Sequence, residues 1–337
     1  MKQLVVCYPA ERRHLEAIGR AAPGYRIDLA DQQSIPEKIH QADLFVGHAK
    51  VPVDWDRVAS AGRLKFIQSS AAGLDHCLAP SIIESPVVVC SASGLFADQV
   101  AEQTLALLLG LLRGLPIFYR QQQQREFVRR PTGDLHRKRV GIVGLGGNGR
   151  RLAQVLWPFR VTIRATDYFP EHKPSEVEEL LPHTQLESLA AWSEILILTL
   201  PLNASTRGVI DRRIFKEMPK GSLLINVARG QCVNEGDLIA ALDQGHLAGA
   251  GLDVTAVEPL PAESPLYSHP NVLITPHVGA QSGPRYDDST RLICENLERY
   301  LAGKPLYNIV DKQLGFPHPS VLYQPSEPLT TSRGRSL

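Results

Sequence analysis

Short apolar runs alternate with longer polar segments along most of the chain. In the first part the apolar runs cover residues 4–8, 44–47, 64–68 and 87–90, and helix-like segments such as 10–21 separate them. Buried strands that alternate with helices are typical of an α/β fold with a parallel sheet. The pattern therefore predicts one α/β unit before residue 98.

A second α/β run begins at Arg139. Its apolar runs predict strands at 140–143, 161–166, 195–200, 222–227, 248–254 and 271–275, and its polar segments predict helices at 149–156, 214–216 and 235–244. Asn234 is expected to cap the last of these helices and Gly245 to end it. Four prolines between residues 255 and 270 exclude a regular helix before the last strand.

The remaining segments have less regular patterns. Residues 98–115 are apolar on most faces, which predicts a helix buried between two bodies, with Asp98 as its cap. The polar run 121–124 is interpreted as an exposed connection, and 284–302 as a final helix. The stretch 311–337 is rich in Pro, Ser and Thr without periodicity, so we expect it to be disordered.

Composition narrows the class of protein. A chain of 337 residues is long enough for about two domains, and 43% hydrophobic and 21% charged residues are typical of a globular protein. A net charge of +1 gives no reason to expect nucleic acid as a partner. The 5 cysteines lack CxxC spacing, which argues against disulfides and metal sites and favours the cytoplasm. No run is long enough for a signal peptide or a membrane span.

Arg229, Glu258 and His277 each follow one of three successive predicted strands. If these strands are parallel neighbours in one sheet, their carboxyl ends share the edge where open α/β sheets bind ligands. A guanidinium group matches a carboxylate, and an imidazole can exchange a proton near neutral pH. The three residues therefore predict proton and hydride chemistry on a substrate that carries a carboxylate.

Residues 144–149 read GlyLeuGlyGlyAsnGly between a predicted strand and a predicted helix. In that context the glycines allow a tight turn and a close approach of a pyrophosphate to the helix N-terminus. Asp167 ends the next predicted strand, where a carboxylate accepts hydrogen bonds from ribose hydroxyls and repels a 2′-phosphate. We therefore predict a dinucleotide site that favours NAD over NADP, although His172 and Lys173 nearby keep NADP as an alternative.

With these motifs in order, the chain resembles the D-isomer-specific 2-hydroxyacid dehydrogenases, among them the glycerate, glyoxylate, hydroxypyruvate and phosphoglycerate dehydrogenases. The matching blocks are 144–149, 201–206, 224–230, 249–259 and 275–279, and the resemblance covers about residues 40–310. It implies an α/β fold of two Rossmann-like, doubly wound parallel-sheet domains. The substrate-binding domain would comprise 1–98 and 284–310, and the NAD-binding domain 99–283 would be inserted into it. It also implies a homodimer.

The resemblance also implies a role for each matching residue. Arg229 would hold the substrate carboxylate and 2-oxo group, His277 would be the general acid and base, and Glu258 would favour the protonated form of His277. Asp253 would bind the nicotinamide carboxamide. Backbone N–H groups of Ala71, Ala72 and Gly73 would receive the substrate carboxylate. The implied cofactor-binding residues are Val100, Gly144, Gly146, Gly147, Asn148, Gly149, Asp167, Thr199, Leu200, Pro201, Thr206, Val227, Ala228, Arg229, Asp253, His277, Gly279 and Ala280.

One residue departs from the family pattern, and the first substrate loop leaves the identity of the substrate open. Asn148 stands where the family usually has an aliphatic residue, so it could face the pyrophosphate or weaken cofactor binding. His48 and Lys50 lie in the first substrate loop, as candidate contacts for a second anionic group or as solvated residues. We expect a small 2-oxo acid such as glyoxylate or hydroxypyruvate, with 3-phosphohydroxypyruvate close behind. A corepressor-like protein that binds NADH without turnover is the alternative.

Overall fold

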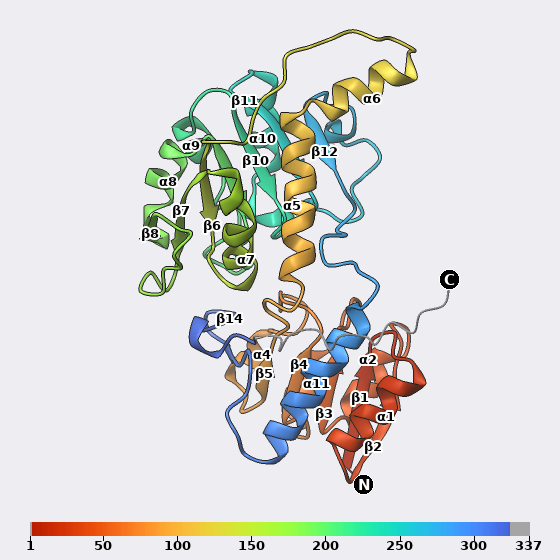
Figure 1. Cartoon of the computed structure of the whole chain (residues 1–337). Helices are drawn as coiled ribbons and strands as arrows, with labels where there is room; N and C mark the ends of the chain where they lie inside the picture. The colour runs from red at the N-terminus through yellow and green to blue at the C-terminus, as the bar shows by residue number, and fades with distance from the viewer. Residues whose placement is uncertain (1, 324–337) are drawn as a thin grey trace, which may run out of the picture.

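The computed structural model of the chain describes residues 2–323, which form two parallel β-sheets flanked by helices (Figure 1). The first sheet has the order β2-β1-β3-β4-β5, and the second has the order β12-β11-β10-β9-β6-β7-β8. This is an α/β fold, as the alternation of apolar and polar segments predicted.

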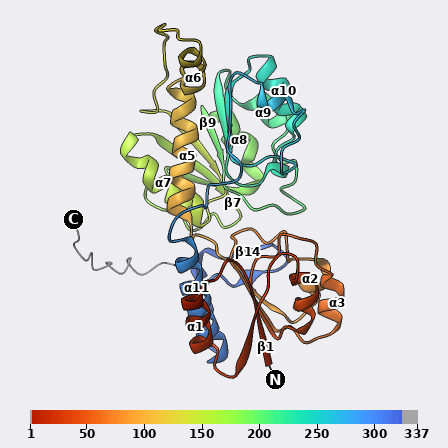
Figure 2. The ribbon, with the colours of Figure 1, turned by 90° about the vertical axis from the view of Figure 1, so that its right-hand side faces the viewer.

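The first sheet comprises β1 (Lys2–Cys7), β2 (Tyr25–Leu29), β3 (Leu44–Gly47), β4 (Phe66–Ser69) and β5 (Val88–Cys90). Its helices are α1 (Arg12–Ala21), α2 (Ile35–Lys38), α3 (Trp55–Ser60) and α4 (Pro80–Glu84). The late helix α11 (Arg285–Leu301) lies beside α1 (Figure 2), and its buried Ile293 and Leu297 share an apolar cluster with Ile18. Helix α11 therefore packs with α1 on the first sheet. The first sheet with its helices is called the first body below, and the second sheet with its helices is called the second body.

The second sheet comprises β6 (Arg139–Val143), β7 (Thr162–Asp167), β8 (Glu179–Pro182), β9 (Ile195–Leu198), β10 (Ser222–Asn226), β11 (Leu247–Leu252) and β12 (Val272–Ile274). Its helices are α7 (Gly147–Leu156), α8 (Leu186–Trp192), α9 (Arg212–Glu217) and α10 (Glu235–Asp243). The Asn234 side chain accepts a hydrogen bond from the backbone N of Asp237 at 3.1 Å, which confirms the predicted cap. Single 3-10 turns occur at Ile39–Gln41, Trp157–Phe159, His183–Gln185, Gly230–Cys232, Pro265–Tyr267 and Pro319–Val321.

The apolar pattern missed two strands, β2 and β8. Strand β2 lies at one edge of the first sheet, and β8 lies at one edge of the second. Neither strand contains a fully buried residue, since every position is at least partly accessible. An edge strand needs fewer apolar side chains because it has one neighbour and is less covered. Such strands therefore lack the continuous apolar run by which the central strands were predicted.

Helix α5 (Ala97–Leu112) runs from the first body along the second sheet (Figure 1). The predicted cap at Asp98 is wrong: Phe96 occupies the N-cap position, and the Asp98 carboxylate forms an ion pair with Arg151 on α7. The connection predicted at 121–124 is also wrong over most of its length. Helix α6 (Leu115–Gln123) includes it, and Gln121 is buried against the body, a tertiary contact that the polar run does not reveal.

The predicted disorder from residue 311 is wrong as far as residue 323, and residues 324–337 lie outside the described part of the chain. Strand β13 (Val310–Asp311) pairs antiparallel with β14 (Phe316–Pro317). Val310 and Tyr323 are both buried. The segment is ordered by contacts with parts of the chain far away in sequence, which a local pattern cannot show.

Within residues 2–323, only one pair of consecutive helices has the combined length and hydropathy of a membrane span. No single helix there is long and apolar enough to cross a bilayer, and a bent pair, α5 with α6 at 67°, passes that test only when its two helices are combined. Seven residues of α5, among them Leu107 and Leu108, are buried inside the protein. The apolar character of α5 is therefore accounted for by packing on the second sheet.

Candidate active site

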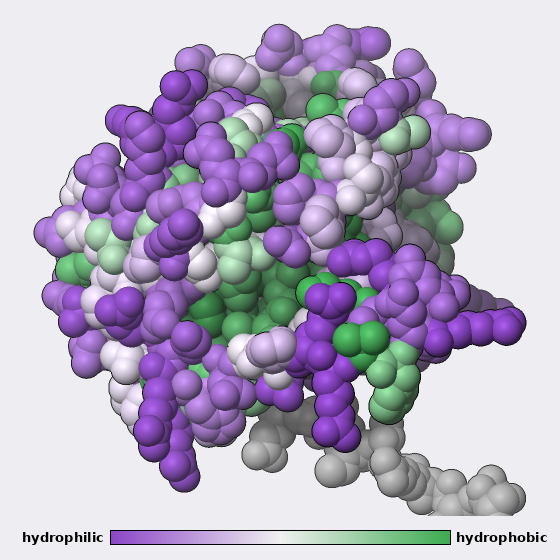
Figure 3. All heavy atoms as spheres, turned by 90° about the horizontal axis from the view of Figure 1, so that it is seen from above, coloured by the Kyte–Doolittle hydropathy of each residue, from purple (hydrophilic) through white to green (hydrophobic). Residues whose placement is uncertain are grey.

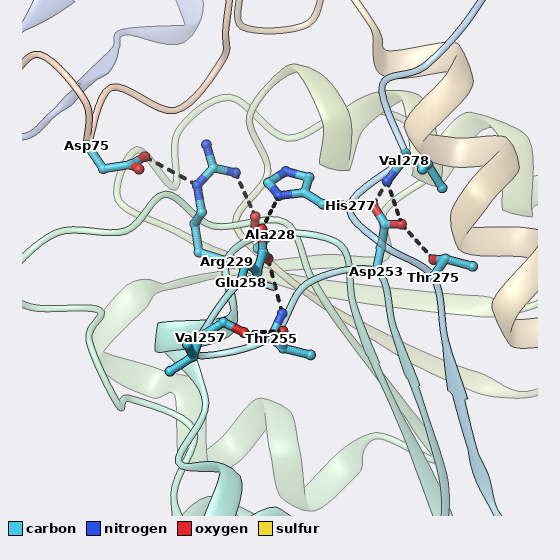
Figure 4. Close-up of polar contacts among 11 residues, drawn as sticks. Asp75, Ala228, Arg229, Asp253, Thr255, Val257, Glu258, Thr275, His277 and Val278 are labelled. Carbon is cyan, nitrogen blue, oxygen red and sulfur yellow. Dashed lines mark hydrogen bonds and ion pairs between the residues drawn. The ribbon is translucent and has the colours of Figure 1, made fainter. Parts of the chain in front are cut away.

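Arg229, Glu258 and His277 lie at one edge of the second sheet. They follow β10, β11 and β12, which are parallel neighbours in that sheet. The side chains converge where these strands end (Figure 4). The geometric prediction from the strand ends is therefore confirmed.

His277 and Glu258 form a direct pair. His277 Nδ1 lies 2.8 Å from Glu258 Oε2, and Glu258 Oε1 accepts a hydrogen bond from the backbone N of Thr255 at 3.2 Å. Burial acts to raise the pKa of Glu258, but the hydrogen bond and charge of His277, with the backbone N–H of Thr255 and the charge of Arg229, together outweigh it, so the pKa lies below the ordinary carboxyl value. A charged Glu258 holds Nδ1, and the half-exposed ring presents Nε2 as the nitrogen that can exchange a proton with a ligand.

Asp253 fixes the turn that carries His277. Its Oδ1 accepts hydrogen bonds from Thr275 Oγ1 at 2.6 Å and from the backbone N of Val278 at 3.0 Å, and its Oδ2 accepts one from the backbone N of Gly279 at 2.8 Å. The residue is 3% exposed. His277 itself has a φ of 54°, in the left-handed region, so these bonds hold a backbone conformation that a histidine rarely adopts.

Arg229 lies between the two bodies. Its Nη1 donates to the carbonyl of Ala228 at 2.8 Å, and its Nε lies 3.2 Å from Oδ1 of Asp75, in the loop after β4 (Figure 4). Burial acts most strongly on the pKa of Asp75 and raises it, but the charge and hydrogen bond of Arg229, with a backbone hydrogen bond and the influence of His76, together lower it below the ordinary carboxyl value. Sequence reasoning missed Asp75, because nothing local to residue 75 indicates that it meets a residue 154 positions away.

The loop at 71–73 touches the same guanidinium. A Cβ placed on Gly73 would lie 1.9 Å from Arg229 Nη2, so only glycine leaves room for the arginine in this position. Ala72 and Gly73 line the cavity described below, whereas the backbone N of Ala71 already donates to Ser69 Oγ at 3.0 Å. Of the predicted carboxylate-binding amides, those of Ala72 and Gly73 are therefore the better placed.

A cavity of about 230 Å³ runs from Arg229 along the strand ends to Asp167. Its floor is the glycine turn after β6. Gly144 has a φ of 92°, and a Cβ there would lie 2.8 Å from Leu200 Cα, while a Cβ on Gly149 would lie 2.3 Å from the carbonyl O of Gly144. A Cβ on Gly146 would meet nothing within 4 Å, so this surface is open toward the cavity. The turn and the N-terminus of α7 fit a pyrophosphate.

Asp167 lies at the far end of this cavity. Its Oδ2 accepts a hydrogen bond from the backbone N of Leu145 at 2.5 Å, and its Oδ1 accepts one from that of Phe169 at 2.9 Å. These bonds leave lone pairs for ribose hydroxyls. The Lys173 ammonium donates to the carbonyl of Val177 at 2.7 Å, and neither Lys173 nor His172 lines the cavity.

Most residues predicted to bind the cofactor line this one cavity. They are Gly144, Gly146, Gly147, Asn148, Asp167, Thr199, Leu200, Pro201, Thr206, Val227, Ala228 and Arg229. The others lie beyond its lining: Val100, Gly149, Asp253, His277, Gly279 and Ala280. Sequence reasoning missed Tyr168, Phe169 and the C-terminal residues Phe316, Pro317, Pro319 and Leu322, which also line it. The C-terminal set follows no motif.

His48 stacks on His76 rather than offering a cation. Their ring centroids are 3.9 Å apart with an angle of 18° between the planes. Burial lowers the pKa of His48 to about 3 and that of His76 to about 4, so both rings are neutral near pH 7. Lys50 is exposed. Contact of His48 or Lys50 with a second anionic group stays a prediction, and a neutral His48 would meet such a group without a positive charge.

Comparison with known proteins agrees with this geometry. Residues 105–279 match the family described as D-isomer specific 2-hydroxyacid dehydrogenase, NAD binding domain. The chain is 35% identical to glyoxylate/hydroxypyruvate reductase A of Photorhabdus laumondii over 80% of this chain and 88% of that protein. It is 30% identical to D-3-phosphoglycerate dehydrogenase of Mycobacterium tuberculosis, but spans only 53% of that protein's length.

A solved structure resembles the whole arrangement. The NADPH-dependent glyoxylate/hydroxypyruvate reductase of Sinorhizobium meliloti, in complex with NADP and sulfate, superposes with a TM-score of 0.79 at 25% identity. The match covers 94% of this chain and 100% of that chain. The likeness therefore extends over both sheets and the cleft between them.

Proposed function

Because the chain belongs to the D-isomer-specific 2-hydroxyacid dehydrogenase family, we propose that it interconverts a small 2-oxo acid and the corresponding D-2-hydroxy acid with NAD(H) as cofactor. The observation that carries the proposal is the pair of His277 Nδ1 and Glu258 Oε2 at 2.8 Å, beside Arg229 at the same sheet edge. A proton carrier and a carboxylate anchor are what reduction of a 2-oxo acid requires.

The side chains divide the work of the reaction. Reduction adds a hydride to C2 of the acid and a proton to its oxygen, and the nicotinamide supplies or accepts that hydride. Arg229, with the amides of Ala72 and Gly73, holds the substrate carboxylate. His277 donates the proton through Nε2, and in the reverse direction removes it. Glu258 stays ionised, orients the ring through Nδ1 and stabilises the imidazolium.

The substrate we propose is small and lacks a phosphate, such as glyoxylate or hydroxypyruvate. The neutral stack of His48 on His76 supports this, since both rings are influenced by the charges of Asp75 and Arg229 and so lie beside the proposed carboxylate site. A phosphate would need cationic partners there. Lys50 is exposed and the histidines are neutral, so 3-phosphohydroxypyruvate is the poorer substrate.

We propose NAD(H) as the preferred cofactor because Asp167 presents a carboxylate at the ribose end of the cavity. That charge would repel a 2′-phosphate. Several similar structures hold NADP or NADPH, so the preference needs measurement. Binding of NADH and NADPH to the same preparation, followed by their intrinsic fluorescence, gives the two dissociation constants directly.

Turnover is tested by following oxidation of NADH and of NADPH at 340 nm with a panel of 2-oxo acids. Glyoxylate and hydroxypyruvate should be reduced, and 3-phosphohydroxypyruvate should have a lower kcat/KM. Saturable cofactor binding without turnover on any acid would contradict the enzyme and favour the corepressor-like alternative. The product's configuration, determined by chiral chromatography, checks the D specificity.

We also propose that the protein is a homodimer that pairs through the arm formed by α6 and residues 125–138. The arm extends from the body (Figure 1) and exposes Leu115, Tyr119, Phe127 and Val128, with Phe127 99% exposed. Seen from this end, apolar residues gather toward the middle of the face between polar ones (Figure 3). Exposed apolar surface of this kind marks an interface. Light scattering after size exclusion should give twice the chain mass, and Phe127→Asp should reduce it.

A further inference from the structure

The C-terminal strap, defined here as residues 312–322, begins on the first body. Just before it, Asn308 Nδ2 donates to the carbonyls of Ser91 at 3.1 Å and Ser93 at 2.9 Å. Lys312 Nζ donates to the carbonyl of Ile82 in α4 at 3.0 Å. The base of the strap is therefore held by the body that contains the first sheet.

The tip of the strap lies on the second body. Asn203 Nδ2 donates to the carbonyl of Leu314 at 3.1 Å. The ring of Phe316 meets Phe169 edge-on with centroids 6.1 Å apart, and the ring of His318 lies 4.4 Å from that of Phe169 and 5.3 Å from that of His172. The middle of the strap thus touches the loop that follows Asp167, and its end returns to the first body, where the backbone N of Asn308 donates to the carbonyl of Val321 at 2.7 Å. Figures 1 and 2 both place β14 between the two bodies.

The strap also closes one side of the cofactor cavity. Phe316, Pro317, Pro319 and Leu322 line the same cavity as Asp167. All four side chains are apolar, and Pro317 is buried while the other three are half-buried, so they already face a partly enclosed space. In dinucleotide sites, the acidic residue at this strand end marks the adenosine half of the ligand. An apolar wall at that end fits a flat purine ring, which packs well against aromatic and proline surfaces.

We propose that the C-terminal strap is part of the cofactor site and forms the wall of the adenosine subsite, with Phe316 as its main contact surface. The inference rests on the proposed function, because it assumes that the cavity holds a dinucleotide. It adds that residues from outside the nucleotide-binding fold set the affinity for adenosine-bearing ligands. A purely structural strap would hold the two bodies together without affecting that affinity.

The test uses the full-length protein and ligands that contain the adenosine half. Dissociation constants for NADH are measured by fluorescence and those for ADP-ribose, which lacks the nicotinamide, by calorimetry. Phe316→Ala should weaken both by about tenfold, the size of one aromatic contact. Trp157→Ala is the matched control, because it removes a 55% exposed aromatic ring at the other end of α7. It should leave both constants unchanged.

The possible outcomes separate the inference from the proposed function. If the wild type binds NADH and ADP-ribose and Phe316→Ala binds both equally well, the strap is not part of the subsite. An equal loss in the Trp157 variant would also overturn the inference, since the effect would not be local. If the wild type binds neither ligand, the proposed function itself fails. Should Phe316→Ala not fold, Phe316→Leu keeps most of the volume without the ring, and the same loss is expected.

Discussion

Gly73→Ala gives the most direct test of how the two bodies build the proposed substrate site. The backbone φ of Gly73 is one that alanine adopts without strain, so the substitution adds only a methyl group. That methyl would lie 1.9 Å from Arg229 Nη2 and 2.7 Å from its Cζ. The clashing atoms are at the end of a flexible side chain. We therefore expect the fold to persist and the guanidinium to move away.

The size of the effect follows from the distance. The guanidinium has to move by about 1.5 Å to reach an ordinary contact distance. A misplacement of about 1 Å near the reacting groups costs roughly a hundredfold in rate. We therefore expect kcat/KM for the best acid of the panel to fall by about a hundredfold, which corresponds to about 2.7 kcal/mol of transition-state stabilisation.

The assay measures kcat/KM together with the midpoint of thermal unfolding and the dissociation constant for NADH. Gly283→Ala is the matched control, since a Cβ there meets nothing within 4 Å. It should behave as the wild type. If Gly73→Ala retains kcat/KM within about threefold, or if Gly283→Ala is impaired to the same extent, the placement of Arg229 against this loop is not what anchors the substrate.

Three further outcomes are expected. His277→Ala should lower kcat by at least about a hundredfold while NADH binding persists; a variant that unfolds instead would remove the main support for its catalytic role. Asp167→Asn keeps the acceptor oxygen but not the charge, and should shift the ratio of NADH to NADPH dissociation constants toward NADPH by about tenfold; an unchanged ratio would mean that Asp167 does not set the preference. The pKa values of His48 and His76 are lower in the folded protein than in the unfolded chain, so the unfolded chain binds protons first as the pH falls. The free energy of unfolding should therefore decrease below about pH 6.5, by about 2 kcal/mol for either ring at pH 5. Urea unfolding at pH 7 and pH 5 should show His48→Phe losing less stability than the wild type.

Local pattern predicted the central architecture because central strands and glycine turns have local causes. A central parallel strand is covered on both faces, so β9 and β10 appear as continuous apolar runs. The turn at Gly144 needs a positive φ, which the sequence expresses as glycine. Parallel order then brings Arg229, Glu258 and His277 to one edge. The sequence by itself was therefore enough for the fold class, the glycine turn after β6 and the shared edge at which these three residues lie.

The tertiary structure alone decided which distant residues complete the site. Asp75 meets Arg229, His76 stacks on His48, and Phe316 faces the cavity beyond Asp167. None of these pairings follows from spacing. The first and the third join the two bodies, and the stack joins the loops after β3 and β4 within the first body. Burial of the same stack lowers the pKa of both rings, which the residue type in this loop does not reveal. Sequence determined the chemistry at the strand ends, and long-range packing determined the walls around it.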